Sequence, residues 1–266
     1  METVIMPEDL VAELPLERGD RVLVASDVTT LCWEAIQHGK KFDLSRLIDL
    51  MQEKLGPEGT LLFPTYNWDF CHGKAFDYRK TRSRTGALGQ TALGRKDFRR
   101  TQHALYSFAV WGKDADLLVA MKDANSFAGD TPFDYFYKFH AKMIILDVVP
   151  AHSFTFVHYV EEMHGVDYRF KKNFTGRYID EDGAASERTY QMFVRYLDGP
   201  KATVDHPRQS EWLIESGAID ERLLGDITIG VSDFAKAYGI IEKELGECQG
   251  AHLIAYVNKG EIDEGK

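Results

Sequence analysis

The chain has 266 residues, a mass of 30.3 kDa and a formal net charge of −10, with 44% hydrophobic and 28% charged residues. This composition is typical of a soluble globular protein, and the acidic balance argues against nucleic acid as a partner because phosphate binding needs clustered cations. No apolar run reaches the roughly 18 residues of a membrane span. The acidic N-terminal segment is unlike a secretory signal, and three widely spaced cysteines (Cys32, Cys71, Cys248) favour a reducing compartment, so we expect a cytoplasmic protein.

Hydrophobic periodicity predicts strands that alternate with helices in the first part of the chain. A strand is expected at Arg21–Ser26, and a helix at Leu44–Leu55 with Asp43 as its N-cap. Further strands are expected at residues 60–65, 106–111 and 142–149, with a short helix at 133–139.

The second part of the chain continues this alternation after an interruption. Residues 167–187 are charged and dotted with glycine, which indicates an exposed loop or a hairpin excursion. A strand at 189–196, helices at 210–216 and 232–245, and a last strand at 252–257 follow. We therefore expect one domain spanning residues 1–266, with a layered α/β/α fold around a central mixed sheet.

The most informative segment is 151–162, which follows the apolar run 143–149. It places His158 and Glu161 three residues apart, on one face of the helix if the segment is helical. A carboxylate that orients a histidine makes a general base. Thr155 stands one turn earlier, and Ser153 is expected to cap the helix. The alternative interpretation is a core histidine beside a surface glutamate.

A basic cluster between residues 79 and 100 stands out in this acidic chain. It is either a solvated, exposed face or a subsite for a small phosphate-bearing ligand, with the acidic remainder attracting a cationic substrate. The polar segment that follows has the same ambiguity: it is a capping turn, or a loop that holds a ligand through Arg100, Thr101, His103 and Ser107.

Metal binding is the main alternative chemistry. His152, His158, Glu161 and His164 form a candidate ligand set for a metal-dependent hydrolase. No H-E-x-x-H or C-x-x-C pattern is present, so we expect no metal. The sequence also lacks a G-x-S-x-G elbow and a phosphate-binding P-loop, and the neighbours Cys71 and His72 point apart, which argues against a cysteine nucleophile.

Several segments resemble, in the same order along the chain, the aminoglycoside 3-N-acetyltransferase family, whose fold is not of the Gcn5 type. Residues 19–28 take the place of its G-D-x-V-L-V-H-S-S-L motif, and residues 59–66, followed by Trp68 and Asp69, match its G-T-L-x-x-P-T-F/Y strand. The other matches are 100–107 for R-S-x-H-P-x-x-S, 129–132 for G-x-x-S-P, 152–161 for D-S-N-T-x-L-H-x-A-E, and 225–255 for the C-terminal pattern.

The resemblance implies direct acetyl transfer from acetyl-CoA, as cosubstrate, to an amino group on a sugar. His158 would be the base and Glu161 would fix its tautomer. The oxyanion donors would come from the backbone of Asp27, Val28 and Thr29 or from the Thr155 hydroxyl. Arg100, Thr101, His103 and Ser107 would lie beside the pantetheine and phosphates of the donor.

The chain departs from the family motif at His152 and Phe154, where members often carry Asp and Asn, and at Ala104, where they carry Pro. The acceptor would be bound by Tyr66, Trp68, Asp69, His152 and Phe154, with Phe70 adding to an aromatic pocket. Aromatic faces suit a sugar or nucleobase better than a polycation, so we expect an amino sugar of glycan or sugar-nucleotide type rather than an aminoglycoside antibiotic. The sequence leaves open whether the protein serves antibiotic resistance or glycan biosynthesis. A non-catalytic carbohydrate-binding relative remains an alternative, and the sequence leaves open whether the protein forms a homodimer.

Overall fold

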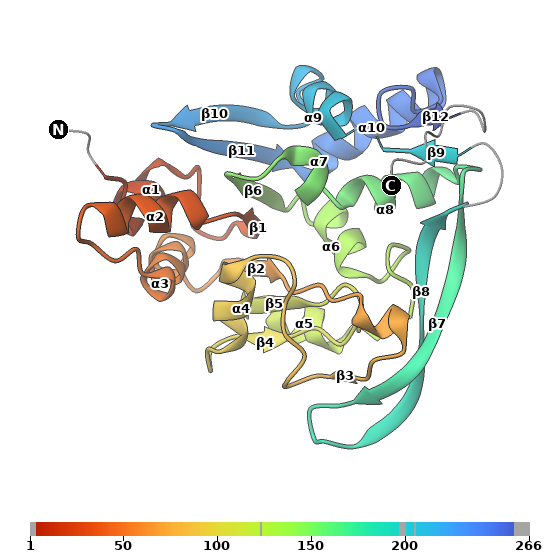
Figure 1. The fold of residues 1–266 in the computed structure, drawn as a ribbon, viewed down its shortest axis with the longest axis horizontal. Helices are drawn as coiled ribbons and strands as arrows, with labels where there is room; N and C mark the ends of the chain where they lie inside the picture. Colours follow the sequence, from red (N-terminus) through yellow and green to blue (C-terminus); the bar gives the residue numbers. More distant parts are fainter. Residues whose placement is uncertain (1–3, 123, 197–200, 205, 258–266) are drawn as a thin grey trace, which may run out of the picture.

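The computed structural model describes residues 4–122, 124–196, 201–204 and 206–257, and contains a central seven-stranded sheet (Figure 1). β1 (Arg21–Ser26) pairs in parallel with β2 (Thr60–Pro64) on one side and with β6 (Lys142–Leu146) on the other. The remaining neighbours are antiparallel, so the predicted mixed sheet is confirmed. The strand order is β10 (Asp220–Leu224), β11 (Ile227–Asp233), β6, β1, β2, β5 (Phe108–Gly112) and β4 (Arg99–Arg100).

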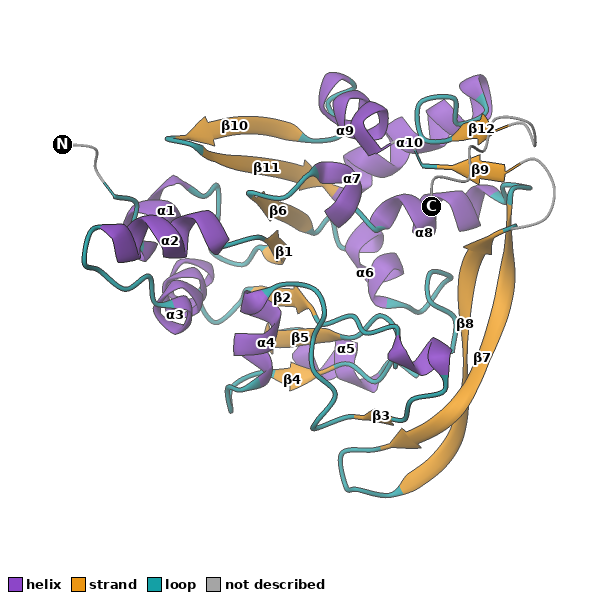
Figure 2. Ribbon diagram, in the orientation of Figure 1, coloured by secondary structure: helices purple, strands orange, loops and turns teal. Residues whose placement is uncertain are grey.

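Helices cover both faces of this sheet because its buried strands carry apolar side chains on both faces (Figure 2). In β1, Val22 and Val24 belong to one core cluster while Leu23 and Ala25 belong to the other. The first cluster includes α1 (Pro7–Glu13), α2 (Thr29–Gln37), α3 (Leu44–Leu55) and α4 (Ala87–Leu93); the second includes α6 (Pro132–Lys138), α8 (Phe156–His164) and α10 (Phe234–Cys248). The α/β/α layering is thus confirmed.

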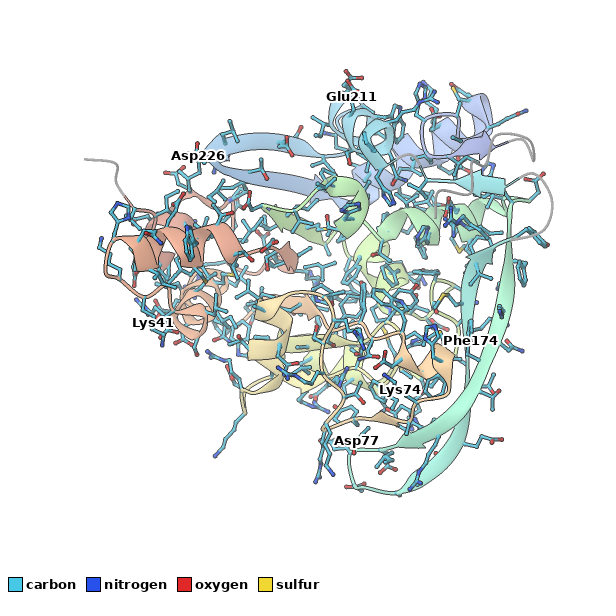
Figure 3. All side chains as sticks on the ribbon, in the orientation of Figure 1. Lys41, Lys74, Asp77, Phe174, Glu211 and Asp226 are labelled. Carbon is cyan, nitrogen blue, oxygen red and sulfur yellow. The ribbon has the colours of Figure 1, made fainter. Side chains whose placement is uncertain are left out.

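A long hairpin is the largest feature outside the sheet. β7 (Arg169–Ile179) and β8 (Ala185–Arg195) pair along their full length, so the segment predicted as a loop or hairpin is a hairpin that extends beyond residue 187. The Tyr178 and Tyr190 hydroxyls both donate to the Gln102 carbonyl oxygen, at 3.0 and 3.1 Å, and attach the hairpin to the body. Figure 3 shows Phe174 on this hairpin and Asp77 of β3 (Phe76–Asp77), which pairs with β7.

The remaining elements are short. They are α5 (Ala115–Ala120), α7 (Pro150–Ser153), α9 (His206–Glu215), the 3₁₀ helix η1 (Asp69–His72), and the two-stranded sheet of β9 (Lys201–Thr203) and β12 (Ala255–Val257). No helix in the described ranges is long and apolar enough to cross a membrane.

Two predicted elements need correction at the C-terminal end. The strand expected at 252–257 covers only Ala255–Val257 and lies outside the central sheet, paired with β9. The helix expected from residue 232 begins at Phe234, because Ser232 and Asp233 complete β11 and the Asp233 carboxylate accepts the Lys236 N–H at 2.8 Å as the N-cap. By contrast, Asp43 caps α3 as predicted, accepting from Ser45 N and Arg46 N at 2.9 and 3.2 Å.

Candidate active site

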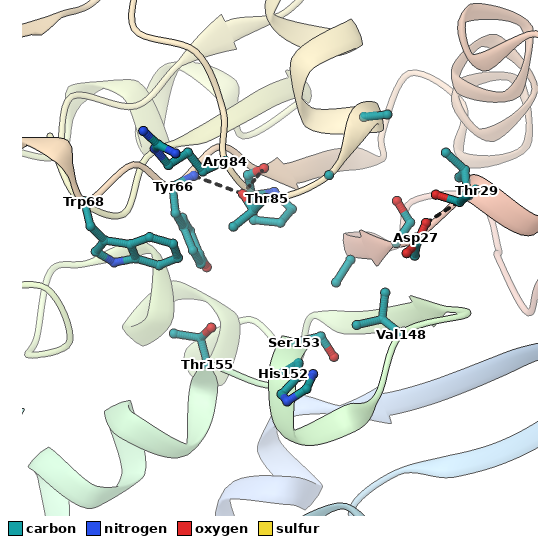
Figure 4. Close-up of a pocket in the computed structure, with 16 residues that line it drawn as sticks. Asp27, Thr29, Tyr66, Trp68, Arg84, Thr85, Val148, His152, Ser153 and Thr155 are labelled. Carbon is teal, nitrogen blue, oxygen red and sulfur yellow. Dashed lines mark hydrogen bonds between the residues drawn. The ribbon is translucent and has the colours of Figure 1, made fainter. Parts of the chain in front are cut away.

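A cavity of about 540 Å³ opens at the carboxyl ends of the parallel strands β1, β2 and β6 (Figure 4). Ligands bind at this edge in open α/β sheets because the loops after neighbouring strands converge there. Its lining residues are Ala25, Ser26, Asp27, Val28, Thr29, Pro64, Tyr66, Trp68, Arg84, Thr85, Gly86, Ala87, Val148, His152, Ser153 and Thr155. Seven predicted site residues are among them: Asp27, Val28, Thr29, Tyr66, Trp68, His152 and Thr155.

One wall is the turn between β1 and α2. The Asp27 carboxylate accepts the Thr29 N–H at 2.9 Å, so the first turn of α2 begins beside the cavity. Gly86 lies against this turn with a φ of +86°, and a Cβ atom there would come within 2.9 Å of the Ser26 carbonyl oxygen. Only glycine allows the loop to approach this closely.

The opposite wall is aromatic and carries a pair of hydroxyl groups. The hydroxyls of Tyr66 and Thr155 point toward one another (Figure 4). Burial raises the pKa of Tyr66 well above its ordinary value, and the hydrogen bond with Thr155 only partly opposes this shift. The ring of Tyr66 meets Trp68 edge-on, with centroids 6.2 Å apart.

The predicted pairing of His158 with Glu161 is confirmed. Nδ1 of His158 lies 2.7 Å from Oε2 of Glu161, a carboxylate whose side chain is 1% exposed. Tyr168 donates to Oε1 at 2.9 Å, and Arg169 forms an ion pair with Oε2 at 2.7 Å. The His158 side chain is 28% exposed and meets the ring of Phe127 edge-on at 5.6 Å.

The surroundings settle which groups carry charge. Burial, assisted by Arg169, lowers the pKa of His158 below its ordinary value although Glu161 opposes the shift. Burial alone would raise the pKa of Glu161, but His158 and Arg169 together hold it below its ordinary value. At neutral pH the carboxylate is therefore ionised and the imidazole neutral, with the proton on Nδ1 and a lone pair on Nε2. Thr155, the N-cap residue of α8, lines the cavity. His158 lies one turn further along on the same face, but neither His158 nor Glu161 is among the lining residues.

Three residues predicted to contact the donor have their polar groups used inside the protein. Arg100 is buried and donates to Ser107 Oγ at 3.0 Å, to the Thr81 carbonyl at 2.6 Å and to the Thr65 carbonyl at 3.2 Å. The Thr101 hydroxyl accepts the Phe108 N–H at 2.9 Å. None of Arg100, Thr101 and Ser107 lines the cavity. His103 lies outside this cavity as well, where Nδ1 accepts the N–H groups of Leu105 and Tyr106 at 3.2 and 3.1 Å.

The aromatic acceptor pocket is smaller than the sequence indicates. Phe154 is 3% exposed and packs against Phe156 and Phe234, and Phe70 is 3% exposed against Tyr190, so neither ring lines the cavity. Asp69 lies outside it too, in ion pairs with Arg84 and Lys74. Tyr66 and Trp68 remain as the aromatic wall.

Ser153 does not cap the helix that carries His158, contrary to the prediction. Ser153 lies in α7, where its hydroxyl donates to the Pro150 carbonyl at 3.2 Å, and α8 begins after Thr155 without a capping side chain. A short extra helix between β6 and α8 moves the start of α8 past Ser153.

Four of the eight cations between residues 79 and 100 form ion pairs with residues that the structure describes, one of them Lys80 with Asp77 at 3.9 Å. Arg95 pairs with Asp49 and Asp97 at 2.7 and 2.9 Å, Arg84 pairs with Asp69, and Arg99 pairs with Asp116. The cluster is thus partly ion-paired, and its buried member Arg100 is directed at backbone carbonyls rather than at a ligand.

The candidate metal ligands do not converge. His152 packs against His206, with ring centroids 4.6 Å apart, while His158 pairs with Glu161 and His164 with Glu242. Within the described residues no group of three or more His, Cys, Asp or Glu side chains could hold a metal ion. Cysteine chemistry is not supported either, because burial raises the pKa of Cys71 to about 11.

The fold and this site define an acetyl-CoA-dependent N-acetyltransferase. The model of the family described as aminoglycoside 3-N-acetyltransferase matches residues 23–245, so the chain belongs to that family. No curated protein sequence matches the chain.

Solved structures share the fold at low sequence identity. The structure of AAC-IIIb with CoASH has a TM-score of 0.74 and 18% identity, over 92% of this chain and 98% of that one. AAC-VIa bound to sisomicin has a TM-score of 0.73 and 19% identity, over 93% and 99% of the two chains. YokD from Bacillus subtilis has a TM-score of 0.67 and 19% identity, over 90% and 96%.

Proposed function

We propose that this enzyme transfers the acetyl group of acetyl-CoA directly to the amino group of an amino sugar, with His158 as the general base. The observation that carries the proposal is the 2.7 Å contact between Nδ1 of His158 and the buried carboxylate of Glu161. This contact holds the proton on Nδ1 and leaves Nε2 free to accept one.

The amine reaches the enzyme as an ammonium ion and must lose a proton before it can attack. His158 accepts that proton at Nε2, and the ionised Glu161 stabilises the resulting imidazolium. The neutral amine nitrogen then bonds to the thioester carbonyl carbon, and the C–S bond breaks. The nitrogen loses its second proton and the departing sulfur gains one, so the products are the amide and the free thiol of CoA. Much of the acceleration comes from holding amine and thioester together, which is worth several kcal/mol.

The cavity offers hydrogen-bond donors for the thioester oxygen. The Thr155 hydroxyl points into it, one turn from His158 on α8. At the other wall, the donor we assign is the backbone N–H of Val28, the N-cap residue of α2, because the N–H groups of Asp27 and Thr29 are already donated to the Leu146 carbonyl and the Asp27 carboxylate. Donors directed at a developing oxyanion stabilise the tetrahedral intermediate more than the substrate. We place the acetyl-CoA end of the reaction between these two walls.

The charge of the cavity favours an amino sugar of glycan or sugar-nucleotide type over an aminoglycoside antibiotic. Asp27 is the one carboxylate among the lining residues that the structure describes, and it already accepts a backbone N–H from Thr29. Arg84 brings a guanidinium group to the same lining. A polycation gains little from such a surface, whereas Tyr66 and Trp68 offer faces for a sugar or nucleobase.

A panel of acceptors tests this proposal, with release of free CoA thiol as the readout. Amino sugars, amino-sugar nucleotides and aminoglycosides are each offered at equal concentration with acetyl-CoA. We expect thiol release with an amino sugar or its nucleotide and a lower kcat/KM with aminoglycosides. Acetyl-CoA binding without thiol release for any acceptor would identify a non-catalytic relative, and a preference for aminoglycosides would contradict the assigned substrate class.

A further inference from the structure

Asp147, the residue that follows β6, has a strained backbone at the edge of the sheet where the cavity opens. Its φ is +51°, in the left-handed region, which is unfavourable for residues other than glycine. A residue keeps such a conformation where its surroundings hold it there. The next residue, Val148, lines the cavity, so the strain lies directly beside the candidate active site.

Two hydrogen bonds hold Asp147, and they come from different elements. Its N–H donates to the Thr228 carbonyl of β11 at 2.9 Å, which fixes the backbone. Its carboxylate oxygen Oδ2 accepts the hydroxyl proton of Thr30, in the first turn of α2, at 2.8 Å. This second bond is partly buried and joins residues 117 positions apart in the chain. It connects the end of β6 to the start of α2.

The start of α2 has few other attachments. Of the nine residues of this helix, all of them described, two are buried, Leu31 and Ala35. The N-cap residue Val28 has no side chain that could cap the helix. On the side of β1, the Asp27 N–H donates to the Leu146 carbonyl at 2.8 Å. On the side of the helix, the position of the first turn depends on the bond between Thr30 and Asp147.

This bond joins two parts of the cavity wall from outside the lining. Val28 and Thr29 line the cavity from α2, and Val148 lines it from the segment after β6 (Figure 4). Thr30 and Asp147 are not among the lining residues, so neither side chain occupies space that a substrate would fill. A donor stabilises a developing oxyanion only while it is directed at that oxygen. A small displacement of α2 would therefore weaken the contribution of the Val28 N–H.

We propose that Asp147 is a positioning residue, whose carboxylate holds the first turn of α2 through Thr30 and keeps the Val28 N–H directed at the thioester oxygen. Glycine would adopt the same backbone conformation without strain, but it would remove the acceptor of the Thr30 hydroxyl. The catalytic part of this inference rests on the proposed function, whereas the attachment of α2 to Asp147 does not.

Asp147→Gly separates positioning from stability. Glycine relieves the backbone strain while the hydrogen bond is lost, so the melting temperature should change by less than about 3 °C. The kcat for thiol release should fall about tenfold, because the oxyanion donor is misdirected. The KM for acetyl-CoA should change less than about twofold. Asp147→Asn keeps an oxygen acceptor and tolerates the same φ, so it should recover most of the activity.

His140→Gly is the matched control. His140 also has a left-handed backbone, with a φ of +49°, but it is exposed and lies outside the cavity lining. Its replacement gives the same relief of backbone strain and should leave kcat unchanged.

Two further measurements test the partner and the helix. Thr30→Val removes the hydroxyl and should lower kcat by the same factor as Asp147→Gly. The double variant should lose no more than either single variant, because both substitutions remove one interaction. Hydrogen–deuterium exchange reports the attachment without catalysis. Exchange in the first turn of α2 should become faster in Asp147→Gly and Thr30→Val, and keep the wild-type rate in His140→Gly.

These readouts distinguish a failure of this inference from a failure of the proposed function. If the wild type releases no thiol with any acceptor, the proposed function and the catalytic part fail together, and the exchange rates decide whether Asp147 holds α2. Unchanged exchange in Asp147→Gly would overturn the inference. Faster exchange with an unaltered kcat would do the same, as would losses of kcat that add in the double variant or that appear equally in His140→Gly.

Discussion

Oε2 of Glu161 lies 2.7 Å from Nδ1 of His158 and accepts the proton of that ring nitrogen. The same oxygen forms an ion pair with Arg169 of β7, and Oε1 accepts the Tyr168 hydroxyl. A buried carboxylate with three partners stays ionised and keeps a single orientation. The imidazole it holds is therefore oriented by the residues around β7 as well as by its own helix.

The first prediction concerns His158. Replacement by Ala removes the proposed base, so kcat should fall by about 10²–10⁴-fold while the Kd for acetyl-CoA changes little. Thiol release and calorimetry measure the two quantities. His164→Ala is the control, because His164 lies on the same helix but pairs with Glu242 at the surface, and it should retain activity. Unchanged turnover of the His158 variant would remove this residue from the mechanism.

The second prediction concerns the pH dependence of kcat/KM. Burial and Arg169 lower the pKa of His158, so wild-type activity should stay high as the pH falls to about 6.5 and decline only below it. Arg169→Gln removes one cause of the lowered pKa. The imidazole then becomes protonated at a higher pH, and the acid limb should move to higher pH.

Arg169→Lys is the matched control for that shift. It keeps the charge beside Glu161 and should restore the position of the acid limb, even at a reduced rate. A purely structural role for Arg169 would lower kcat/KM at every pH and leave the limb where it is in the wild type.

The third prediction concerns Thr155. Thr155→Val keeps the shape of the side chain and removes the hydroxyl that points into the cavity. If this hydroxyl stabilises the oxyanion, kcat should fall by about 10–100-fold with little change in KM for acetyl-CoA. Thr91→Val serves as the matched control, because the Thr91 hydroxyl donates to the Ala87 carbonyl within α4 and Thr91 does not line the cavity, so its steady-state constants should match the wild type. A rise in KM alone would instead assign Thr155 to binding.

The fourth prediction concerns Gly86. A Cβ atom there would lie 2.9 Å from the Ser26 carbonyl oxygen, so Gly86→Ala should push the loop away from the β1 turn and raise KM for acetyl-CoA several-fold. Gly73→Ala separates strain from contact, since Gly73 also has a positive φ, of +78°, but no atom lies within 4 Å of its added Cβ. Both variants should lose about 1 kcal/mol of stability in thermal unfolding, and only Gly86→Ala should change KM. Equal KM values for the two variants would show that the contact with Ser26 does not shape the donor site.

The fifth prediction concerns acceptor choice. His152→Asp adds a carboxylate to a lining whose described part has one carboxylate, that of Asp27. The kcat/KM for a polycation such as sisomicin should rise about five- to tenfold, the gain of roughly 1 kcal/mol expected of an exposed ion pair. His152→Asn makes a similar change of shape without charge and should give no gain. If both variants respond alike, charge does not determine the preference.

Local sequence was sufficient for most of the core. The periodicity of residues 44–55 and the Asp43 cap predict α3 because the contacts involved lie within four residues. The apolar run of β1 predicts that strand in the same local way, whereas the mixed character of the sheet was inferred from too few helical crossovers for a wholly parallel one. β10 and β11 were not predicted. β10 is a polar edge strand whose side chains are mostly exposed, and the apolar pattern of β11 is interrupted by Thr228, Gly230 and Ser232.

Some features of the candidate site were likewise predicted from local sequence, and others were decided by the tertiary structure. The i, i+3 spacing of His158 and Glu161 on one helix determined their contact, and the order of the motifs placed Asp27, Tyr66, Trp68 and Thr155 around one cavity. The tertiary structure alone decided that Arg169 completes the carboxylate, that Arg100 turns inward to backbone carbonyls and that Phe154 enters the core. These contacts join residues far apart in the chain, or depend on which neighbours fill a side chain's surroundings. The spacing of residues along the chain does not specify such contacts, because they form only when the elements pack on the two faces of the sheet.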